Sequence, residues 1–153
     1  EPGMVALFDV GCRLDGYCAD MTRTFFFGAE PDEEFRRVYE AVEAANAAAE
    51  QVAAPGVSFS DIDRAARDVI GRAGYGEYFT HRTGHSIGLE GHEPGDVSSA
   101  HTAPVEPGMC FSVEPGIYLP GRFGVRIEDL VCVTENGSQV LNHYPKGLEV
   151  VGA

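Results

Sequence analysis

The stretch Asp9–Thr24, DVGCRLDGYCADMTRT, places an Asp-Gly pair at positions 15–16 between two β-prone runs. Asp-Gly is a favoured two-residue turn in β-hairpins, and it fixes which residues face each other across the two strands. With this turn Asp9 faces Thr22, and Asp20 lies two residues before Thr22 on the same strand. Because residues that face each other or lie two apart share one side of a sheet, we predict that these three side chains project from one face.

The opening of this hairpin is echoed later in the chain, where residues 1–11, EPGMVALFDVG, are matched by residues 106–116, EPGMCFSVEPG. Each copy begins with Glu-Pro-Gly-Met, continues as a β-prone run and carries an acid eight residues after its first glutamate. These acids are Asp9 and Glu114. A carboxylate that interrupts an apolar strand needs a partner or a metal ion, so the echo predicts a second acidic hairpin.

In this second hairpin we interpret residues 120–124 as a five-residue loop, so that Glu114 faces Leu130. Arg126 and Glu128 then share the face of Glu114, because residues two apart in a strand point to the same side. Each hairpin therefore presents two acids, and we expect the two acidic faces to converge on one centre.

Two helices are predicted between the hairpins. Apolar residues recur at helical spacing from Asp32 to about Ala54, and the Pro-Gly pair that follows ends the helix. A second helix, capped by Ser60, runs to about Arg72 and is stopped by Gly74. The resulting order is hairpin, helix, helix, histidine-bearing strand, hairpin, which makes an α+β fold of about one and a half repeats. We therefore expect an upstream helix pair and strand to be absent from this chain.

Three histidines lie in the glycine-rich stretch Thr80–Glu93, THRTGHSIGLEGHE. His81 and His85 have the spacing of a helical zinc site, but the glycines around them are unfavourable in a helix. In a strand, His85 and His92 would lie on opposite faces unless a bulge or turn intervenes. The three are therefore not expected to form one all-histidine metal site, and structural histidines in a loop remain the alternative.

One metal site can be assembled from the acids of both hairpins and the histidine strand: Asp9, Asp20, His85, Glu114 and Glu128. An oxygen-rich set with one imidazole suits Mn²⁺ and admits Co²⁺, Fe²⁺ or Zn²⁺. Four carboxylates balance the charge of two divalent ions, which favours two ions over one. Two such ions can lower the pKa of a shared water and supply a hydroxide nucleophile. The alternative is a set of ordinary surface acids and a loop histidine.

Four segments together closely resemble the pita-bread metallopeptidases, which include methionine aminopeptidase, aminopeptidase P and Xaa-Pro dipeptidase: DVGCRLDGYCADMTRT, HRTGHSIGLEGHE, SVEPGIY and VRIEDLV. The histidine segment looks most like Xaa-Pro dipeptidase (prolidase). The resemblance implies the pita-bread (creatinase/aminopeptidase-like) fold, a curved antiparallel sheet with helices on its outer face. The family's catalytic domain begins further upstream, so we expect residues 1–153 to be the C-terminal part of an N-terminally truncated catalytic domain.

The resemblance also implies a role for each ligand. Asp9 would bind one ion, and Asp20 would bridge both. His85 and Glu114 would complete one ion, and Glu128 would bridge to the other.

Further roles follow from the same resemblance. Glu114 would carry the proton from water to the leaving amine, and His92 would contact the substrate carbonyl or stabilise the tetrahedral intermediate. His81 would contact the substrate carboxylate. Thr22 and Arg126 would orient the ligands.

The function implied is hydrolysis of Xaa-Pro bonds in short peptides by a dinuclear metallopeptidase that uses a metal-bridged hydroxide. Aminopeptidase P and a general or methionine aminopeptidase are the nearest alternatives. A catalytically inactive binding module on the pita-bread fold and a metal-free hydrolase of the creatinase type are further ones, and retention of all five ligand positions disfavours both.

The composition narrows the partners and the compartment. The 24 acidic and 11 basic residues give a formal net charge of −13, which argues against nucleic acid or an anionic membrane surface as a partner. The four cysteines form no CxxC motif, and we expect buried free thiols, as in the reducing cytoplasm. Without the upstream helices part of the sheet would expose apolar surface, so we also expect self-association, for instance as a homodimer.

Overall fold

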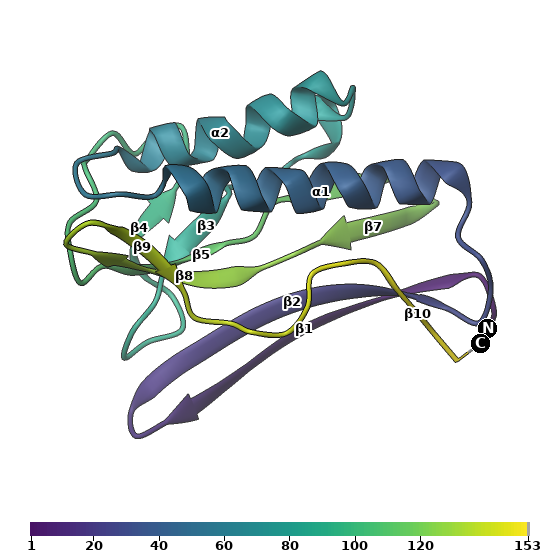
Figure 1. Ribbon diagram of the computed structural model, residues 1–153, viewed down its shortest axis with the longest axis horizontal. Coiled ribbons are helices and arrows are strands. Elements are labelled where there is room, and N and C mark those ends of the chain that lie inside the picture. Colours follow the sequence, from purple (N-terminus) through teal and green to yellow (C-terminus); the bar gives the residue numbers. More distant parts are fainter. Residues whose placement is uncertain (153) are drawn as a thin grey trace.

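The computed structural model describes residues 1–152, and Figure 1 shows their arrangement. Two helices lie side by side over the strands of the second half of the chain, and the N-terminal hairpin curves away beneath those strands. A short 3₁₀ turn at Gly76–Tyr78 follows the helices. The elements run in the order β1 (Met4–Leu14), β2 (Tyr17–Phe27), α1 (Glu33–Val52), α2 (Phe59–Arg72), β3 (Gly84–Ser86), β4 (Glu93–Val97), β5 (Cys110–Val113), β6 (Gly116–Leu119), β7 (Phe123–Arg126), β8 (Asp129–Thr134), β9 (Gly137–Val140) and β10 (Glu149–Val151).

The first hairpin has the predicted register. Asp15 and Gly16 form its turn with φ of 50° and 91°, the positive values that a tight turn between twisted strands requires. Asp9 pairs with Thr22, and Gly11 pairs with Asp20. The register prediction for this hairpin is therefore confirmed.

The second hairpin is paired two residues out of the predicted register. Leu119 pairs with Phe123, so the loop spans three residues rather than five. Leu130 pairs with Ser112, and the predicted pairing of Glu114 with Leu130 is wrong. The flanking pairs, Val113 with Asp129 and Gly116 with Arg126, place Glu114 opposite Glu128. Because a shift of two residues keeps every side chain on its face, both acids still point to the same side.

The described strands form three sheets. Their orders are β1-β2-β10, β4-β3-β5-β8-β9 and β6-β7. Neighbouring strands are antiparallel, except that β10 runs parallel to β2. The chain's last described strand thus returns to the first hairpin, close to the N-terminus (Figure 1).

Both helices begin at capping side chains. The Asp32 carboxylate accepts a hydrogen bond from the backbone N–H of Phe35 at 2.7 Å, so the first helix begins where the pattern predicted. The second helix begins after Ser58, whose hydroxyl accepts from the N–H of Asp61 at 3.1 Å. The predicted cap, Ser60, is wrong because the first turn starts earlier and buries Phe59 beneath the helix.

The core lies between the helices and the strands beneath them. The apolar faces of α1 and α2 meet β5 to β8 in one cluster of buried side chains. In contrast, the outward face of β1 exposes large apolar side chains, among them Phe8, Val10 and Leu14. Exposed apolar surface is therefore present as predicted, and self-association stays a prediction. Neither helix of the described residues is long and apolar enough to cross a membrane.

The four cysteines are free, but their burial differs from the prediction. Cys12 is exposed because it lies on the outward face of β1, and the other three are partly buried. Cys12 pairs with Ala19 rather than with Cys18, so these two thiols do not face each other across the hairpin.

Close packing between β3 and β5 yields a first test. A Cβ added at Gly84 would lie 1.8 Å from the carbonyl oxygen of Ser112, so Gly84→Ala must push the two strands apart. We expect this variant to lose about 3 kcal/mol of unfolding free energy, measured by urea titration. Gly91→Ala is the control, because a Cβ there has no atom within 4 Å. Equal urea midpoints for the two variants would contradict the close approach.

Candidate metal centre

The two hairpins meet at an isolated β-bridge between Thr22 and Glu128. The backbone N–H of Glu128 donates to the carbonyl oxygen of Thr22 at 3.1 Å. The Thr22 hydroxyl in turn donates to the Glu128 carboxylate at 2.5 Å. Both residues are buried. This junction holds the acidic face of β2 against the acid that precedes β8.

Three candidate ligands converge at this junction. One ligand atom from each of Asp20, His85 and Glu128 lies within 4.8 Å of the others. His85 Nε2 lies 3.8 Å from an Asp20 carboxylate oxygen and 3.5 Å from a Glu114 carboxylate oxygen. Atoms that each bind one ion at about 2.1 Å lie about 3.0–3.5 Å from each other. The His85–Glu114 separation has this value, and the group of Asp20, His85 and Glu128 is wider than the ligand shell of one ion.

These side chains line a cavity of about 560 Å³. Eight of the nine predicted site residues reach it, and the ninth, Thr22, contacts Glu128 behind them. Arg82 and Asp96 also reach it, and the sequence reasoning missed both. The lining residues are Asp9, Asp20, His81, Arg82, His85, His92, Asp96, Glu114, Arg126 and Glu128.

A β-bulge brings two of the histidines together. The register between β3 and β4 shifts between His85 and Ser86, and the ring of His92 stacks on that of His85 with centroids 3.9 Å apart. His85 Nδ1–H donates to the carbonyl oxygen of Ser86 at 3.2 Å, which leaves Nε2 as the acceptor facing the carboxylates. The sequence predicted opposite faces for His85 and His92 unless a bulge or turn intervened, and the structure contains such a bulge.

Asp9 lies at the rim of the cavity and is held by Arg126. The Arg126 Nη2 group donates to the Asp9 carboxylate at 2.5 Å, and Nε donates to the Thr22 hydroxyl at 3.2 Å. The Asp9 side chain is 53% exposed, far more than those of Asp20 and Glu114 at 19% and 15%. Asp9 therefore faces the same space as the other candidates but lies outside their tight group.

His81 lines the cavity and is held by Tyr118, a residue that the sequence reasoning missed. The Tyr118 hydroxyl donates to His81 Nε2 at 2.8 Å, because Nδ1–H is used by the Arg82 carbonyl, and it accepts from Arg126 at 3.3 Å. A Cβ at Gly124 would lie 2.7 Å from the Tyr118 ring, so this glycine makes room for it. The sequence signal for Tyr118 was a glycine opposite an aromatic residue. It could be recognised only with the correct register, in which Tyr118 pairs with Gly124.

Residues 1–135 match the family profile described as Metallopeptidase family M24. The chain belongs to this family. An uncharacterized peptidase of Staphylococcus aureus is 51% identical over 140 residues, which cover 92% of this chain and 40% of that protein. The chain thus spans about 40% of the length of the curated relatives it matches.

Solved structures of M24 relatives show the same fold. A dipeptidase PepE from Mycobacterium ulcerans matches with a TM-score of 0.97 and 45% identity, covering 100% of this chain and 41% of that one. A prolidase from Thermococcus sibiricus matches with a TM-score of 0.96 and 42% identity, covering 99% and 41%. An X-Pro aminopeptidase from Thermotoga maritima matches at 0.95 and 42%, covering 99% and 43%. The resemblance to the pita-bread metallopeptidases and the predicted fold class are confirmed.

A metallopeptidase family implies divalent metal ions, and the electrostatics of this M24 site fit them. Burial raises the pKa of Glu128 to about 8, and the negative charges of Glu114, Asp20 and Asp9 add to the effect. Burial, followed by the charge of Asp9, also raises the pKa of Asp20, and burial raises that of Glu114. The site therefore holds more negative charge than its own cations offset, and divalent ions would supply the missing positive charge.

The raised pKa of Glu128 predicts how the stability of the metal-free chain depends on pH. A carboxyl group whose pKa is about 8 when folded, against 4.5 ordinarily, stabilises the fold below pH 4.5 and loses that contribution as the pH rises through 8. The shift corresponds to on the order of 5 kcal/mol at most. We expect the urea midpoint, measured with a chelator present, to fall more between pH 5 and 9 for the wild type than for Glu128→Gln. Parallel pH profiles would contradict this.

Proposed function

We propose that this chain carries the metal centre of a dinuclear M24 peptidase that hydrolyses Xaa-Pro bonds in short peptides. The observation that carries the proposal is the convergence of Asp20, His85 and Glu128 at the bottom of one cavity, with Glu114 within 3.5 Å of the imidazole. Such an arrangement in a metallopeptidase family favours hydrolysis over a purely structural role for these acids.

The five predicted ligands would hold the ions: Asp9, Asp20, His85, Glu114 and Glu128. Divalent ions bound here would supply Lewis acidity to the scissile carbonyl and lower the pKa of water. The hard oxygen donors with one imidazole favour Mn²⁺, with Co²⁺, Zn²⁺ and Fe²⁺ as alternatives. Mn²⁺ as the native ion and the cytoplasmic location stay predictions from the sequence.

Other side chains of the cavity would act on the peptide. Glu114 has a raised pKa and accepts a hydrogen bond from the Ser112 hydroxyl, so it is suited to accept a proton and deliver it to the leaving nitrogen. His92 is exposed above His85, where its ring can donate to the oxyanion of the reacting carbonyl. Burial lowers the pKa of His81, which favours its neutral form for binding substrate polar groups.

Specificity for proline is supported by structural relatives that are prolidases or Xaa-Pro peptidases. These include an Xaa-Pro dipeptidase from Bacillus anthracis, with 42% identity and a TM-score of 0.95. An Xaa-Pro bond is a tertiary amide without an N–H, so the site must deliver a proton to a nitrogen that carries none. Aminopeptidase P is the second candidate, favoured by the match to the X-Pro aminopeptidase and, at 34% identity, to aminopeptidase PepP from Pseudomonas aeruginosa.

Metal stoichiometry and turnover test this function together. We expect about two Mn²⁺ per chain after removal of free ion, and fewer in Asp20→Asn, because Asp20 would be shared between the ions. In the intact enzyme, with measurable cleavage of an Xaa-Pro peptide, Asp20→Asn and Glu114→Gln should each lower kcat by at least about a hundredfold. The count is made by mass spectrometry of the intact chain, and turnover by release of proline.

Glu106→Gln serves as the matched control, because this exposed acid precedes β5 and does not line the cavity. It should retain both the metal count and the rate. Wild-type rates in Asp20→Asn and Glu114→Gln would sink the metallopeptidase proposal. Cleavage of peptides that lack proline at an equal rate would leave a peptidase but remove the Xaa-Pro assignment.

A further inference from the structure

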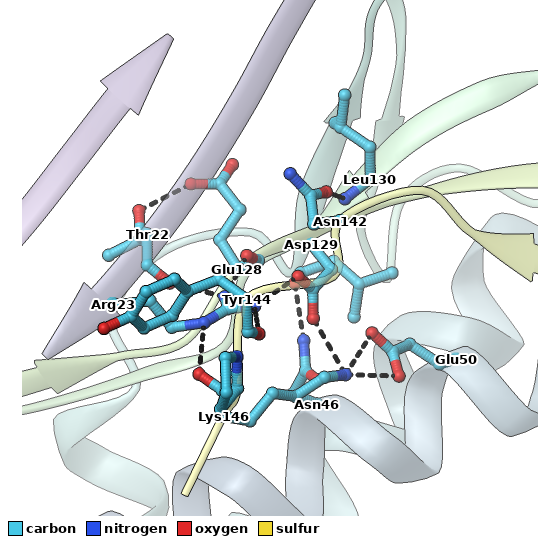
Figure 2. A network of polar contacts seen from close by, with 12 residues as sticks. Thr22, Arg23, Asn46, Glu50, Glu128, Asp129, Leu130, Asn142, Tyr144 and Lys146 are labelled. Carbon is cyan, nitrogen blue, oxygen red and sulfur yellow. Dashed lines mark hydrogen bonds and ion pairs between the residues drawn. The ribbon is translucent and has the colours of Figure 1, made fainter. Parts of the chain in front are cut away.

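A buried network of charges lies behind the metal centre, on the side of β2 and β8 away from the cavity (Figure 2). Arg23 and Asp129 are its central pair, with Nη2 and Oδ1 2.7 Å apart and exposures of 3% and 0%. Each directly follows a residue of the centre, since Thr22 precedes Arg23 and Glu128 precedes Asp129. Because neighbouring residues in a strand point to opposite sides, the network and the ligands share a backbone but not a face.

Arg23 uses each of its five N–H donors, which is the full capacity of a guanidinium group. Four of the five acceptors are backbone carbonyl oxygens, so the side chain is fastened to the main chain of three separate segments. Nη1 donates to the carbonyl oxygens of Thr22 at 2.8 Å and Glu128 at 2.7 Å, Nη2 to the Asp129 carboxylate at 2.7 Å and the Tyr144 carbonyl at 2.8 Å, and Nε to the Pro145 carbonyl at 3.0 Å.

Strands β2 and β8 have no backbone ladder between them in the part of the chain that the structure describes. Thr22 and Glu128 form an isolated bridge, with a backbone hydrogen bond of 3.1 Å. Side chains make the other links. Arg23 Nη1 spans the two carbonyls of the bridge, and two residues along the strands Asn142 donates to the carbonyl of Asp20 at 3.0 Å while accepting from the N–H of Leu130 at 2.6 Å.

The acids of the metal centre lie on both sides of the junction between β2 and the segment that leads into β8. Asp20 belongs to β2, and Glu128 precedes β8, so the separation of their carboxylates follows the separation of the two strands. Arg23 and Asn142 link the backbone segments that carry these two acids, and neither side chain has a hydrogen bond to their carboxylates.

The same network reaches the backbone next to Glu114. The second oxygen of Asp129 forms an ion pair with Lys146 Nζ at 2.8 Å. Lys146 Nζ donates a hydrogen bond to the amide oxygen of Asn46 at 2.7 Å. The amide nitrogen of Asn46 donates to the carbonyl oxygen of Val113 at 2.8 Å, one residue before Glu114. Figure 2 shows this chain of contacts from β2 to helix α1.

We propose that Arg23 and Asn142 are positioning residues of the metal centre, which set the spacing of Asp20 and Glu128 through the backbone. This inference rests on the proposed function, because it concerns the binding of the ions. Net stabilisation is a weak reason for a buried ion pair, since two charges lose about as much hydration as they gain in attraction. The specific property of this ion pair is the planar guanidinium group of Arg23. It joins the carbonyl oxygens of Thr22 and Glu128, on two segments that share no regular backbone pairing.

Arg23→Lys is the main test, because lysine keeps the charge but offers three donors from one atom and no planar fork. The full chain, wild type and variant, is titrated with Mn²⁺, and free ion is followed by electron paramagnetic resonance. We expect Mn²⁺ affinity to fall by about tenfold to a hundredfold, the range for losing a side chain that orients metal ligands. At an Mn²⁺ concentration that saturates the wild type, the number of ions bound per chain should fall from two toward one. An ion held by both Asp20 and Glu128 would need the correct separation of these two carboxylates.

Two further variants separate positioning from stability. Asn142→Ala removes the second link without a change of charge, and we expect a smaller loss of Mn²⁺ affinity in the same direction. Val42→Ala deletes volume from a fully buried position of α1 outside the centre, and it lowers stability without moving a ligand. We expect it to bind Mn²⁺ as the wild type does.

Each outcome decides one question. Wild-type affinity in both Arg23→Lys and Asn142→Ala overturns the positioning role and leaves the proposed function intact. An equal loss of affinity in Val42→Ala also overturns it, because the effect would then follow stability alone. If Arg23→Lys does not fold, Asn142→Ala decides by the same criterion. Failure of the wild type to bind Mn²⁺ overturns the proposed function and this inference with it.

Discussion

The contact between Thr22 and Glu128 is the constraint on which the site depends. It joins two hairpins that are more than a hundred residues apart in the sequence, through a backbone hydrogen bond and a hydrogen bond between the side chains. Without it, the acids of the first hairpin, Asp9 and Asp20, would form one cluster and Glu114 would lie in another. With it, their negative charges are buried together, and the raised pKa of Glu128 is the direct result.

Local turn chemistry explains which parts of the fold could be predicted from the sequence. The Asp-Gly turn at positions 15–16 allows one common register, so the pairing of Asp9 with Thr22 followed from it. The second hairpin has proline and two glycines around its turn, which permit loops of three or five residues, and the longer one was the wrong choice. Glu114 and Glu128 still share one face as predicted, because an even shift preserves the faces. Ser58 and Ser60 are both good caps, and burial of Phe59 decides between them.

The remaining parts of the site depend on contacts that no local pattern encodes. Tyr118 reaches His81 only because a glycine lies opposite it in the correct register. The stacking of His92 on His85 requires a bulge whose position the glycines permit but do not specify. Arg23 is an unremarkable strand residue in sequence, yet its five acceptors come from segments more than a hundred residues away as well as from its neighbour. Such partners become visible only when the tertiary structure is known.

The buried acids also have a consequence for the order in which a metal centre is assembled. With a pKa of about 8, Glu128 holds its proton at neutral pH, so the metal-free pocket partly neutralises itself. In its protonated form this carboxyl group can be buried without a metal ion at a lower cost than a carboxylate. An ion bound by Glu128 would have to displace this proton. A proton and a metal ion thus compete for the Glu128 carboxylate. The pH and the free ion concentration decide which of them is bound.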